Sequence, residues 1–331
     1  MKNIDTWKTT AKKDMDGNLE DKIKGALFGV AIGDALGAPL EFMDKKQIQH
    51  KYGTVDKMIG GGWMDVEQGE VTDDTQMTIA VAKGIVESPD EPEPYIGKYF
   101  IDWLKTDPKD VGRTCRTSIQ NAYCAIQNVP SLSNSNGIAP YIFWSDASKT
   151  NAMESKRENA GNGALMRTVY PGLYYPNEGQ AVHVADRVSR MTHWDEKSAE
   201  ACRLYTKLIH YLTTNASLEV EEKINGISDI LANTSYDNSI IPKVPEPSGY
   251  VVNSFYCALY CLYHTEDLKS AIVMAVNMGG DTDTIGAITG GLAGALYGLS
   301  RIPVIWYAQL DDTVKQTLID LTEKAVENRD H

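Results

Sequence analysis

Two ladders of glycines, each with a spacing of four residues, constrain the fold of this chain more than any other feature. The glycines are Gly25, Gly29, Gly33 and Gly37 in the first ladder, and Gly286, Gly290, Gly294 and Gly298 in the second. Residues four apart share one face of a helix, so each ladder leaves a face without side chains. A glycine inside a helix costs about 1 kcal/mol relative to alanine, and only close packing offsets such a loss. The ladders therefore predict two helices packed tightly together in the middle of the fold.

Apolar residues at intervals of three and four predict many further helices. Their ranges are 73–87, 95–105, 116–127, 181–193, 197–212, 220–233, 252–264, 268–278 and 311–327. Strand patterns of period two are scarce, and the two best, 57–66 and 172–176, are short. The sequence therefore predicts an all-α fold.

No long linker divides the chain after residue 22, which favours a single compact multi-helix domain over residues 22–331. Residues 1–21 are polar and charged and lack periodic apolar positions, so we interpret them as an N-terminal extension.

Composition excludes several classes of partner. The net charge of −13 leaves no basic patch that would release counterions from a nucleic acid. The five cysteines lack CxxC spacing, which argues against a disulfide framework and a zinc site; Cys257 and Cys261, one helical turn apart, fit two core thiols. The chain has neither the apolar segment of a signal peptide nor a run of about 18 apolar residues. We therefore predict a cytoplasmic protein that binds neither nucleic acid nor membrane.

Two acidic motifs lie far apart in the sequence, "TDDT" at 72–75 and "DTDT" at 281–284. Each begins a predicted helix, where Thr and Asp cap free backbone N–H groups, but capping accounts for one acid and not for two. If the motifs met, the carboxylates would repel one another by several kcal/mol unless a cation lay between them. Either the motifs stay apart, or together they hold metal.

Two known motifs contain acids with the spacing of Asp281 and Asp283, and neither fits this sequence. An EF-hand loop starting at Asp281 would need a glutamate where Leu292 stands. A haloacid-dehalogenase-like phosphatase needs a sheet after its DxD motif, and fewer than fifty residues remain. Convergence of the two motifs remains, and its oxygen ligands would be Thr72, Asp73, Asp74, Asp281, Asp283 and Thr284. Such ligands suit two Mg²⁺ ions, with Mn²⁺ as the alternative, about 3.5 to 4 Å apart.

Five segments in this order resemble the ADP-ribosylglycohydrolases, the family of dinitrogenase-reductase-activating glycohydrolase. The segments are 25–42, 69–78, 161–172, 189–193 and 275–298. The resemblance covers roughly residues 22 to 310 and implies an all-α fold with a binuclear Mg²⁺ or Mn²⁺ site.

The resemblance also implies roles for individual residues. The six metal ligands are those proposed above from the residues alone. The substrate-binding residues would be Gly161, Asn162, Gly163, His193, Gly279 and Gly280. Hydrolysis at an anomeric carbon needs a carboxylate and a positioned water, and the candidates for the catalytic carboxylate are Glu41, Asp73 and Asp283. Asp34, inside the first ladder helix, is predicted to anchor packing or a water behind the metal ligands, because an acid there would be buried and hydrogen-bonded.

The resemblance implies a metal-dependent hydrolase that removes ADP-ribose from modified protein side chains, arginine first of all. A serine or O-acyl linkage is the alternative within the same fold. An immunity or binding protein, which blocks an ADP-ribosyltransferase by inserting residues 1–21 with the aromatic Trp7, is the alternative from another class.

Overall fold

The computed structural model describes residues 18–155 and 160–329. Fifteen α-helices and three short 3₁₀-helices form within these ranges, and no strand does. The first eight α-helices are α2 (Leu19–Gly37), α3 (Lys45–Tyr52), α4 (Asp73–Glu87), α5 (Glu93–Leu104), α6 (Arg113–Gln127), α7 (Tyr141–Glu154), α8 (Val169–Tyr174) and α9 (Glu178–Arg190). The remainder are α10 (Glu196–Thr214), α11 (Val220–Leu231), α12 (Val251–Tyr263), α13 (Leu268–Val276), α14 (Thr282–Tyr297), α15 (Val304–Gln309) and α16 (Asp312–Arg329). The predicted all-α fold is confirmed.

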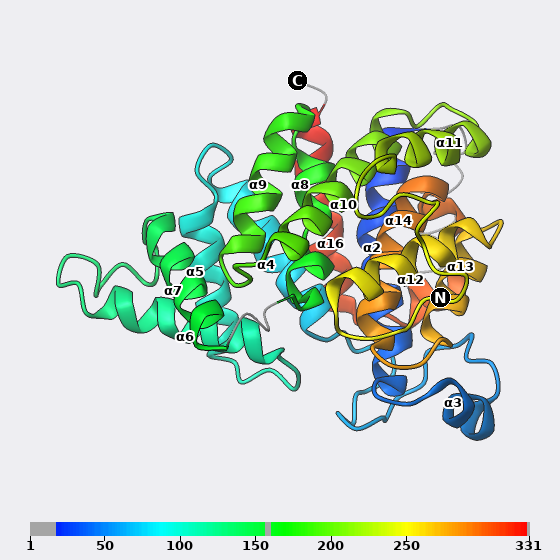
Figure 1. Ribbon diagram of the computed structural model, residues 1–331, viewed down its shortest axis with the longest axis horizontal. Coiled ribbons are helices and arrows are strands. Elements are labelled where there is room, and N and C mark those ends of the chain that lie inside the picture. The colour runs from blue at the N-terminus through cyan, green and yellow to red at the C-terminus, as the bar shows by residue number, and fades with distance from the viewer. Residues whose placement is uncertain (1–17, 156–159, 330–331) are drawn as a thin grey trace.

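The two ladder helices, α2 and α14, lie side by side in the centre of the fold (Figure 1). They run antiparallel, because Gly25 faces Gly294, Gly29 faces Gly290, and Gly33 faces Gly286. A Cβ atom added at Gly29 would overlap the carbonyl group of Gly290, so the two backbones touch directly. The tight helix pair predicted from the ladders is confirmed.

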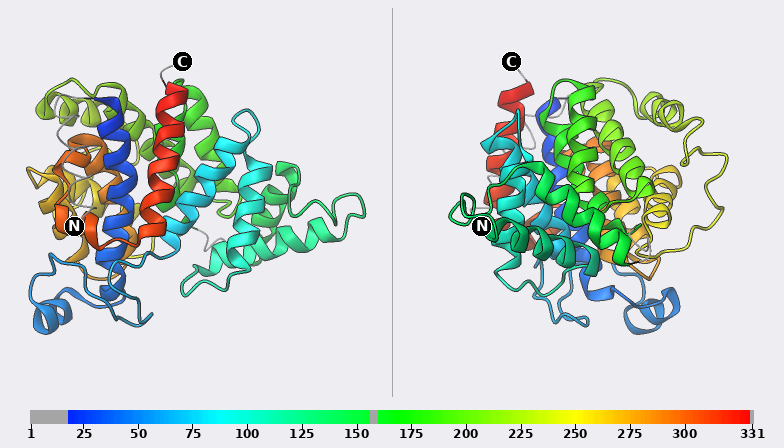
Figure 2. Two further views of the ribbon diagram at one scale, coloured as in Figure 1. Left: turned by 180° about the vertical axis from the view of Figure 1, so that it is seen from behind. Right: turned by 60° about the vertical axis from the view of Figure 1, so that its left-hand side comes forward.

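Other helices surround this pair. Helix α16 lies beside α2 on one side, as both views in Figure 2 show, and α12 and α13 pack on α14. Helices α5, α6 and α7 form an outer part of the molecule at one end of its long axis (Figure 1). Among the described residues, α2 is the one helix that is long and apolar enough to cross a membrane. Its apolar segment is, however, completely buried inside the fold.

Helix α2 begins earlier than the sequence indicates. Asn18 caps it, and its side chain accepts a hydrogen bond from the Glu20 backbone N–H at 3.2 Å. Asp21 is buried and accepts a hydrogen bond from the Ser300 N–H at 2.9 Å, and Lys22 donates to the Leu296 carbonyl at 3.2 Å. The last residues of the predicted extension are therefore part of the core.

Trp7 and the rest of residues 1–17 lie outside the described residues, so the immunity prediction is not tested.

Neither of the two short patterns of period two forms a strand. Residues 172–174 end α8 and Tyr175 is its C-cap; Leu173, Tyr174 and Tyr175 are all buried, so their alternating pattern carries no information about a sheet. Residues 57–66 form a turn with a single antiparallel bridge between Gly61 and Val66.

The sequence pattern does not predict four of the helices: α3, α7, α8 and α15. Helix α3 buries only Ile48, so no apolar stripe reveals it, and the capping box of Asp44 and Gln47 fixes its start.

Candidate functional site

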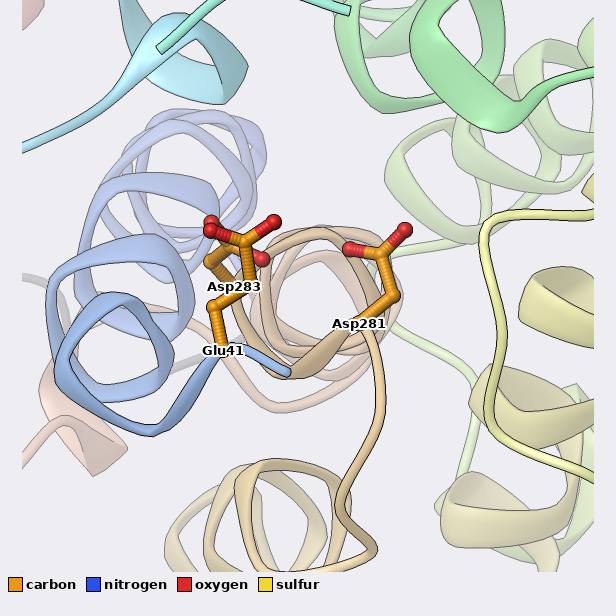
Figure 3. A group of neighbouring side chains, drawn as sticks. All are labelled: Glu41, Asp281 and Asp283. Atoms are coloured by element: carbon orange, nitrogen blue, oxygen red, sulfur yellow. The ribbon is translucent and has the colours of Figure 1, made fainter. Parts of the chain in front are cut away.

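The antiparallel packing of α2 and α14 brings the end of one ladder helix to the start of the other. The Thr282 hydroxyl donates to the carbonyl oxygen of Gly37 at 2.8 Å. The chain leaves α2 through a 3₁₀ turn and reaches Glu41, beside the first residues of α14. Carboxylate oxygens of Glu41, Asp281 and Asp283 lie within 4.8 Å of one another (Figure 3). Two segments more than 200 residues apart thus place three acids in one cluster.

Helix α4 is held against the same place by Asp34. This carboxylate is fully buried in α2 and accepts hydrogen bonds from the backbone N–H groups of Thr72 at 3.0 Å and Thr75 at 3.1 Å, and from both hydroxyls. Four donors on one carboxylate fix the first turn of α4, which carries Asp73 and Asp74. The predicted packing role of Asp34 thus takes a specific form: it caps α4 in place of a local side chain.

The two acidic motifs meet at Asp74. Its Oδ2 atom lies 3.4 Å from the Thr284 hydroxyl and 3.4 Å from the Thr72 hydroxyl. Its other oxygen, Oδ1, is buried, and no hydrogen-bond partner for it is found among the described residues. A buried carboxylate oxygen without a donor is costly unless a cation completes its surroundings.

Burial dominates the electrostatics of this cluster. It raises the pKa of Asp73, Asp74 and Asp283 well above the usual range, and the neighbouring carboxylates raise it further. Burial, with the negative charge of Asp110 next in importance, raises the pKa of Glu41 to about 8. Buried carboxylate oxygens that repel one another in this way are ligands that fit hard divalent cations.

Asp110 is a member of the site that the sequence did not reveal. It is half-buried in the loop before α6, its pKa is raised by burial, and a hydrogen bond with Asp73 opposes that shift. No motif surrounds it, since it stands alone in the segment "PKDVGRT". Only the folded chain brings it to Asp73.

A glycine-containing loop borders the cluster on the side of Asp281. The Asn162 side-chain amide donates to Asp281 Oδ2 at 2.8 Å and to the Ser254 hydroxyl at 2.9 Å. Gly161 pairs with Tyr250 in an isolated bridge, which ties this loop to the start of α12. The predicted substrate-binding loop therefore reaches one of the predicted metal ligands directly.

His193 lies against this loop. Its Nε2 atom is 3.3 Å from the position that a Cβ on Gly161 would take, and burial, with the Arg167 charge second, lowers its pKa to about 3. Buried Arg167 donates to the Thr192 hydroxyl at 2.6 Å, and that hydroxyl lies 2.8 Å from His193 Nδ1. Arginine only donates, so the hydroxyl proton goes to Nδ1. The neutral imidazole therefore carries its own proton on Nε2, toward the loop.

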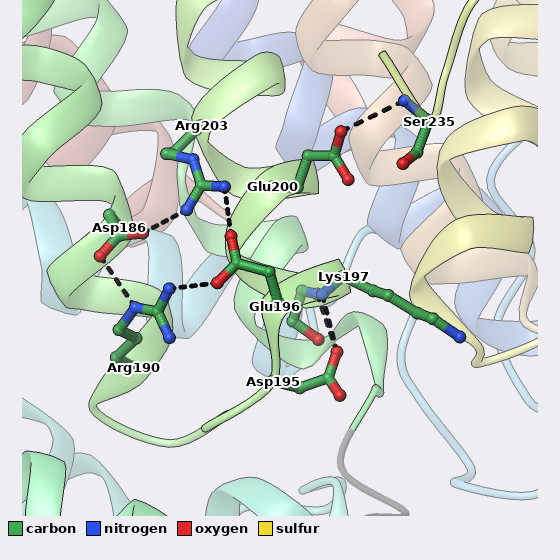
Figure 4. Close-up of polar contacts among 9 residues, drawn as sticks. Asp186, Arg190, Asp195, Glu196, Lys197, Glu200, Arg203 and Ser235 are labelled. Carbon is green, nitrogen blue, oxygen red and sulfur yellow. Dashed lines mark hydrogen bonds and ion pairs between the residues drawn. The ribbon is translucent and has the colours of Figure 1, made fainter.

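The turn that carries His193 is clamped at both ends. It spans residues 191–195 between α9 and α10, so the predicted helix over 181–193 ends three residues early. Arg190 pairs with Asp186 at 2.9 Å and with Glu196 at 2.6 Å, and Arg203 pairs with the same two acids (Figure 4). This network fixes the spacing of the two helices on either side of the turn.

Gly279 and Gly280 have positive φ angles of 87° and 72°. The Gly280 N–H donates to the Met43 carbonyl at 2.8 Å, and the Phe42 N–H donates to the Gly280 carbonyl at 2.8 Å. These glycines therefore join the loop of Glu41 to the start of α14. Their contact with a ligand stays a prediction.

Comparison with known proteins places this site in a family. Residues 15–331 match the sequence profile of the ADP-ribosylglycohydrolase family. The chain belongs to this family. It is therefore an ADP-ribosylglycohydrolase, as the resemblance of its motifs implied, and the match starts at residue 15, seven residues before the domain start expected from the sequence.

Named relatives agree with this assignment. The chain is 33% identical to the ADP-ribosyl-[dinitrogen reductase] glycohydrolase of Rhodospirillum rubrum over 91% of its own length and 94% of the relative's. It is 28% identical to the ADP-ribosylarginine hydrolase Tri1 of Serratia proteamaculans, over 90% of its own length and 77% of the relative's. A solved structure described as an ADP-ribosylglycohydrolase-related protein complex superimposes with a TM-score of 0.74 at 25% identity, covering 93% of this chain and 99% of that one.

Proposed function

We propose that this ADP-ribosylglycohydrolase removes ADP-ribose from arginine side chains of modified proteins in a reaction that depends on divalent cations. Asp74 carries the proposal: it contacts the second acidic motif through Thr284 and keeps one buried oxygen without a hydrogen-bond donor. The arginine linkage is supported by the relative named as an ADP-ribosylarginine hydrolase.

The residues fit two hard cations. Thr72, Asp73 and Asp74 would come from the start of α4, and Asp281, Asp283 and Thr284 from the start of α14. Four carboxylates and two hydroxyls offer oxygen ligands alone, which Mg²⁺ and Mn²⁺ prefer. When bound, such ions neutralise the cluster, orient ribose hydroxyls and make a nearby water more acidic.

The chain's own groups supply binding and proton transfer. We propose that the loop at Gly161–Gly163 and the Nε2–H of His193 bind the diphosphate side of ADP-ribose, because backbone amides and a neutral donor suit that group. Hydrolysis adds the water oxygen to the anomeric carbon and breaks the bond to the arginine nitrogen; one water proton stays on the new hydroxyl and the other ends on that nitrogen. Glu41 is placed at the cluster to take this second proton from the water before it passes to the nitrogen, and Asp73 and Asp283 are the alternatives proposed from the sequence.

The reaction would take place in the cytoplasm, because all five cysteines are free thiols, four of them buried. An ADP-ribosyltransferase held by residues 1–21 stays a prediction.

A direct assay tests the proposed function. The protein is incubated with an arginine-ADP-ribosylated protein after removal of metal with a chelator, and again with Mg²⁺ or Mn²⁺ restored. We expect release of free ADP-ribose only with metal. The variants Asp73→Asn and Asp281→Asn are expected to remain folded and to lose this release. Normal turnover by both variants would refute the assignment.

A further inference from the structure

A groove borders the carboxylate cluster at Glu41, whereas Asn162 contacts the cluster at Asp281. It has a volume of about 700 Å³ and runs between α3 and the turn at residues 60–63. The residues along it are Pro39, Glu41, Phe42, Met43, Gln47, His50, Lys51, Gly62 and Trp63. Glu41 belongs both to this groove and to the acidic cluster, so the groove adjoins the cluster at this residue.

Two large aromatic side chains lie exposed in the groove. Phe42 is 70% exposed and Trp63 is 54% exposed, with ring centroids 5.5 Å apart. Exposed aromatic residues beside a site mark a binding surface more often than a chance feature of the protein surface.

Both rings are held in place by the site itself. The Trp63 indole N–H donates to Glu41 Oε2 at 2.7 Å, which fixes one edge of the ring while the side chain stays 54% exposed. Phe42 has a φ angle of 63°, a conformation that non-glycine residues rarely adopt, and its N–H is held by Gly280. The backbone thus keeps a strained conformation whose result is an exposed phenyl ring.

Helix α3, on the other wall, is basic. Its sequence, KKQIQHKY, holds three lysines and a histidine and no acidic residue, whereas the whole chain has a net charge of −13. Lys51 and His50 line the groove itself. A local excess of positive charge on an acidic protein favours acidic partners through complementary potentials.

The direction of the groove follows from two hydrogen bonds. Asn162 reaches the cluster at Asp281, and Trp63 reaches it at Glu41. In Figure 3 the carboxylate of Asp281 is drawn to one side of those of Glu41 and Asp283, which overlap in this view. If the nucleotide lies on the side of Asn162 and His193, as the proposed function has it, the group attached to the ribose leaves toward Trp63.

We propose that this groove binds the polypeptide segment that carries the ADP-ribosylated arginine, and that it favours segments with acidic residues beside that arginine. This inference rests on the proposed function. Phe42 and Trp63 contact the apolar part of the segment, and Lys51 attracts its acidic side chains. The groove thus selects among target proteins, while the cluster acts on the bond that all of them share.

Three substrates test the inference: free ADP-ribosyl-arginine, and two peptides of equal length with one ADP-ribosylated arginine flanked by acidic or by lysine residues. The test variants are Phe42→Ala and Lys51→Glu. Ile142→Ala is the control for the loss of an exposed apolar side chain, on α7. Lys83→Glu is the control for charge reversal: this exposed lysine of α4 lies over the Tyr99 ring, as Lys51 lies over the Tyr52 ring, and it is about 15 Å along the helix from Asp73.

We expect the unaltered protein to have a kcat/KM about tenfold higher for the acidic peptide than for the basic one, a preference that weakens as salt is added. Phe42→Ala lowers kcat/KM for both peptides about tenfold relative to free ADP-ribosyl-arginine, because one aromatic anchor is lost. Lys51→Glu removes the preference for the acidic peptide. Both control variants behave like the unaltered protein.

Equal kcat/KM values for the two peptides in the unaltered protein overturn the inference. So does an equal loss on all three substrates in Phe42→Ala, which would show damage to the cluster and not to a groove. Failure of the proposed function gives a different result, since the unaltered protein then releases ADP-ribose from none of the three substrates.

Discussion

The helices α2 and α14 build two opposite kinds of interface within a few residues of each other. Along their length, glycine faces glycine and the backbones touch. At their joined end, Glu41, Asp281 and Asp283 crowd together with Asp74 close by, and burial raises the pKa of Asp74 and Asp283. The first interface is neutral and stabilises the fold as it stands. The second crowds buried carboxylates together, and under the proposed function a bound cation would offset their repulsion, which is a common relation between a functional site and the scaffold that holds it.

The glycine interface is the part of this pair on which folding depends most. In Gly29→Val the new side chain meets the Gly290 backbone, which has no rotamer to change, so the helices must separate. Overpacking against a flexible core typically costs 1 to 3 kcal/mol, and against backbone we expect about 4 kcal/mol or more. Chemical denaturation measures this loss in the free energy of unfolding.

Gly112→Ala is the matched control. Nothing lies within 4 Å of the added Cβ, and Gly112 caps α6 with an ordinary φ of −54°. We expect a loss of about 1 kcal/mol at most, because alanine is a poorer N-cap residue than glycine. Similar losses in the two variants would show that the ladder is not the source of tight packing.

The acidic end should respond in the opposite sense. Asp283→Asn removes one buried charge from the cluster, so activity with metal is expected to fall by about 100-fold or more while the metal-free protein keeps or gains stability. Release of ADP-ribose and a thermal melt in the presence of chelator measure the two effects. A variant that loses both activity and stability would mean that Asp283 supports the fold as the glycines do.

Asp34 joins the two interfaces, since it lies in α2 and caps α4. In Asp34→Asn the amide group cannot accept the four hydrogen bonds that the carboxylate accepts, so we expect a loss of about 2 kcal/mol in the free energy of unfolding together with weaker metal binding. Calorimetric titration with Mn²⁺ checks the second effect. Unchanged metal binding would show that the cap from Asp34 is not needed to hold the start of α4 at the cluster.

Metal and pH provide the mildest test. In metal-free protein the raised pKa values mean that the folded state keeps protons that the unfolded state releases, so the free energy of unfolding falls as pH rises from about 4 to about 8. Mg²⁺ or Mn²⁺ at ten times its Kd should restore about 1.4 kcal/mol at pH 8. The gain should be smaller at pH 5, where protons compete. Thermal melts at both pH values, with and without metal, measure the two gains in stability. Equal gains at pH 5 and pH 8 would contradict competition between protons and metal.

Some of the site was predictable because its residues are adjacent in sequence. The motifs at 72–75 and 281–284 each carry two acids where one helix cap would suffice. The glycine ladders predict the two helices, α2 and α14, at whose joined ends the site lies. Asp110 was not predictable, because a single aspartate in a loop has no pattern, and neither was the groove, because the apolar spacing of α3 is too sparse to show a helix.

The sequence by itself determined the helical class, the close pairing of α2 with α14 and the excess of carboxylates, because spacing along a helix is a local property that the chain carries with it. Tertiary structure alone decided that Asp74 touches Thr284, that Asp110 meets Asp73, and that Trp63 bonds Glu41. These contacts join segments that are distant along the chain, and their geometry depends on how whole helices pack, which no local pattern encodes.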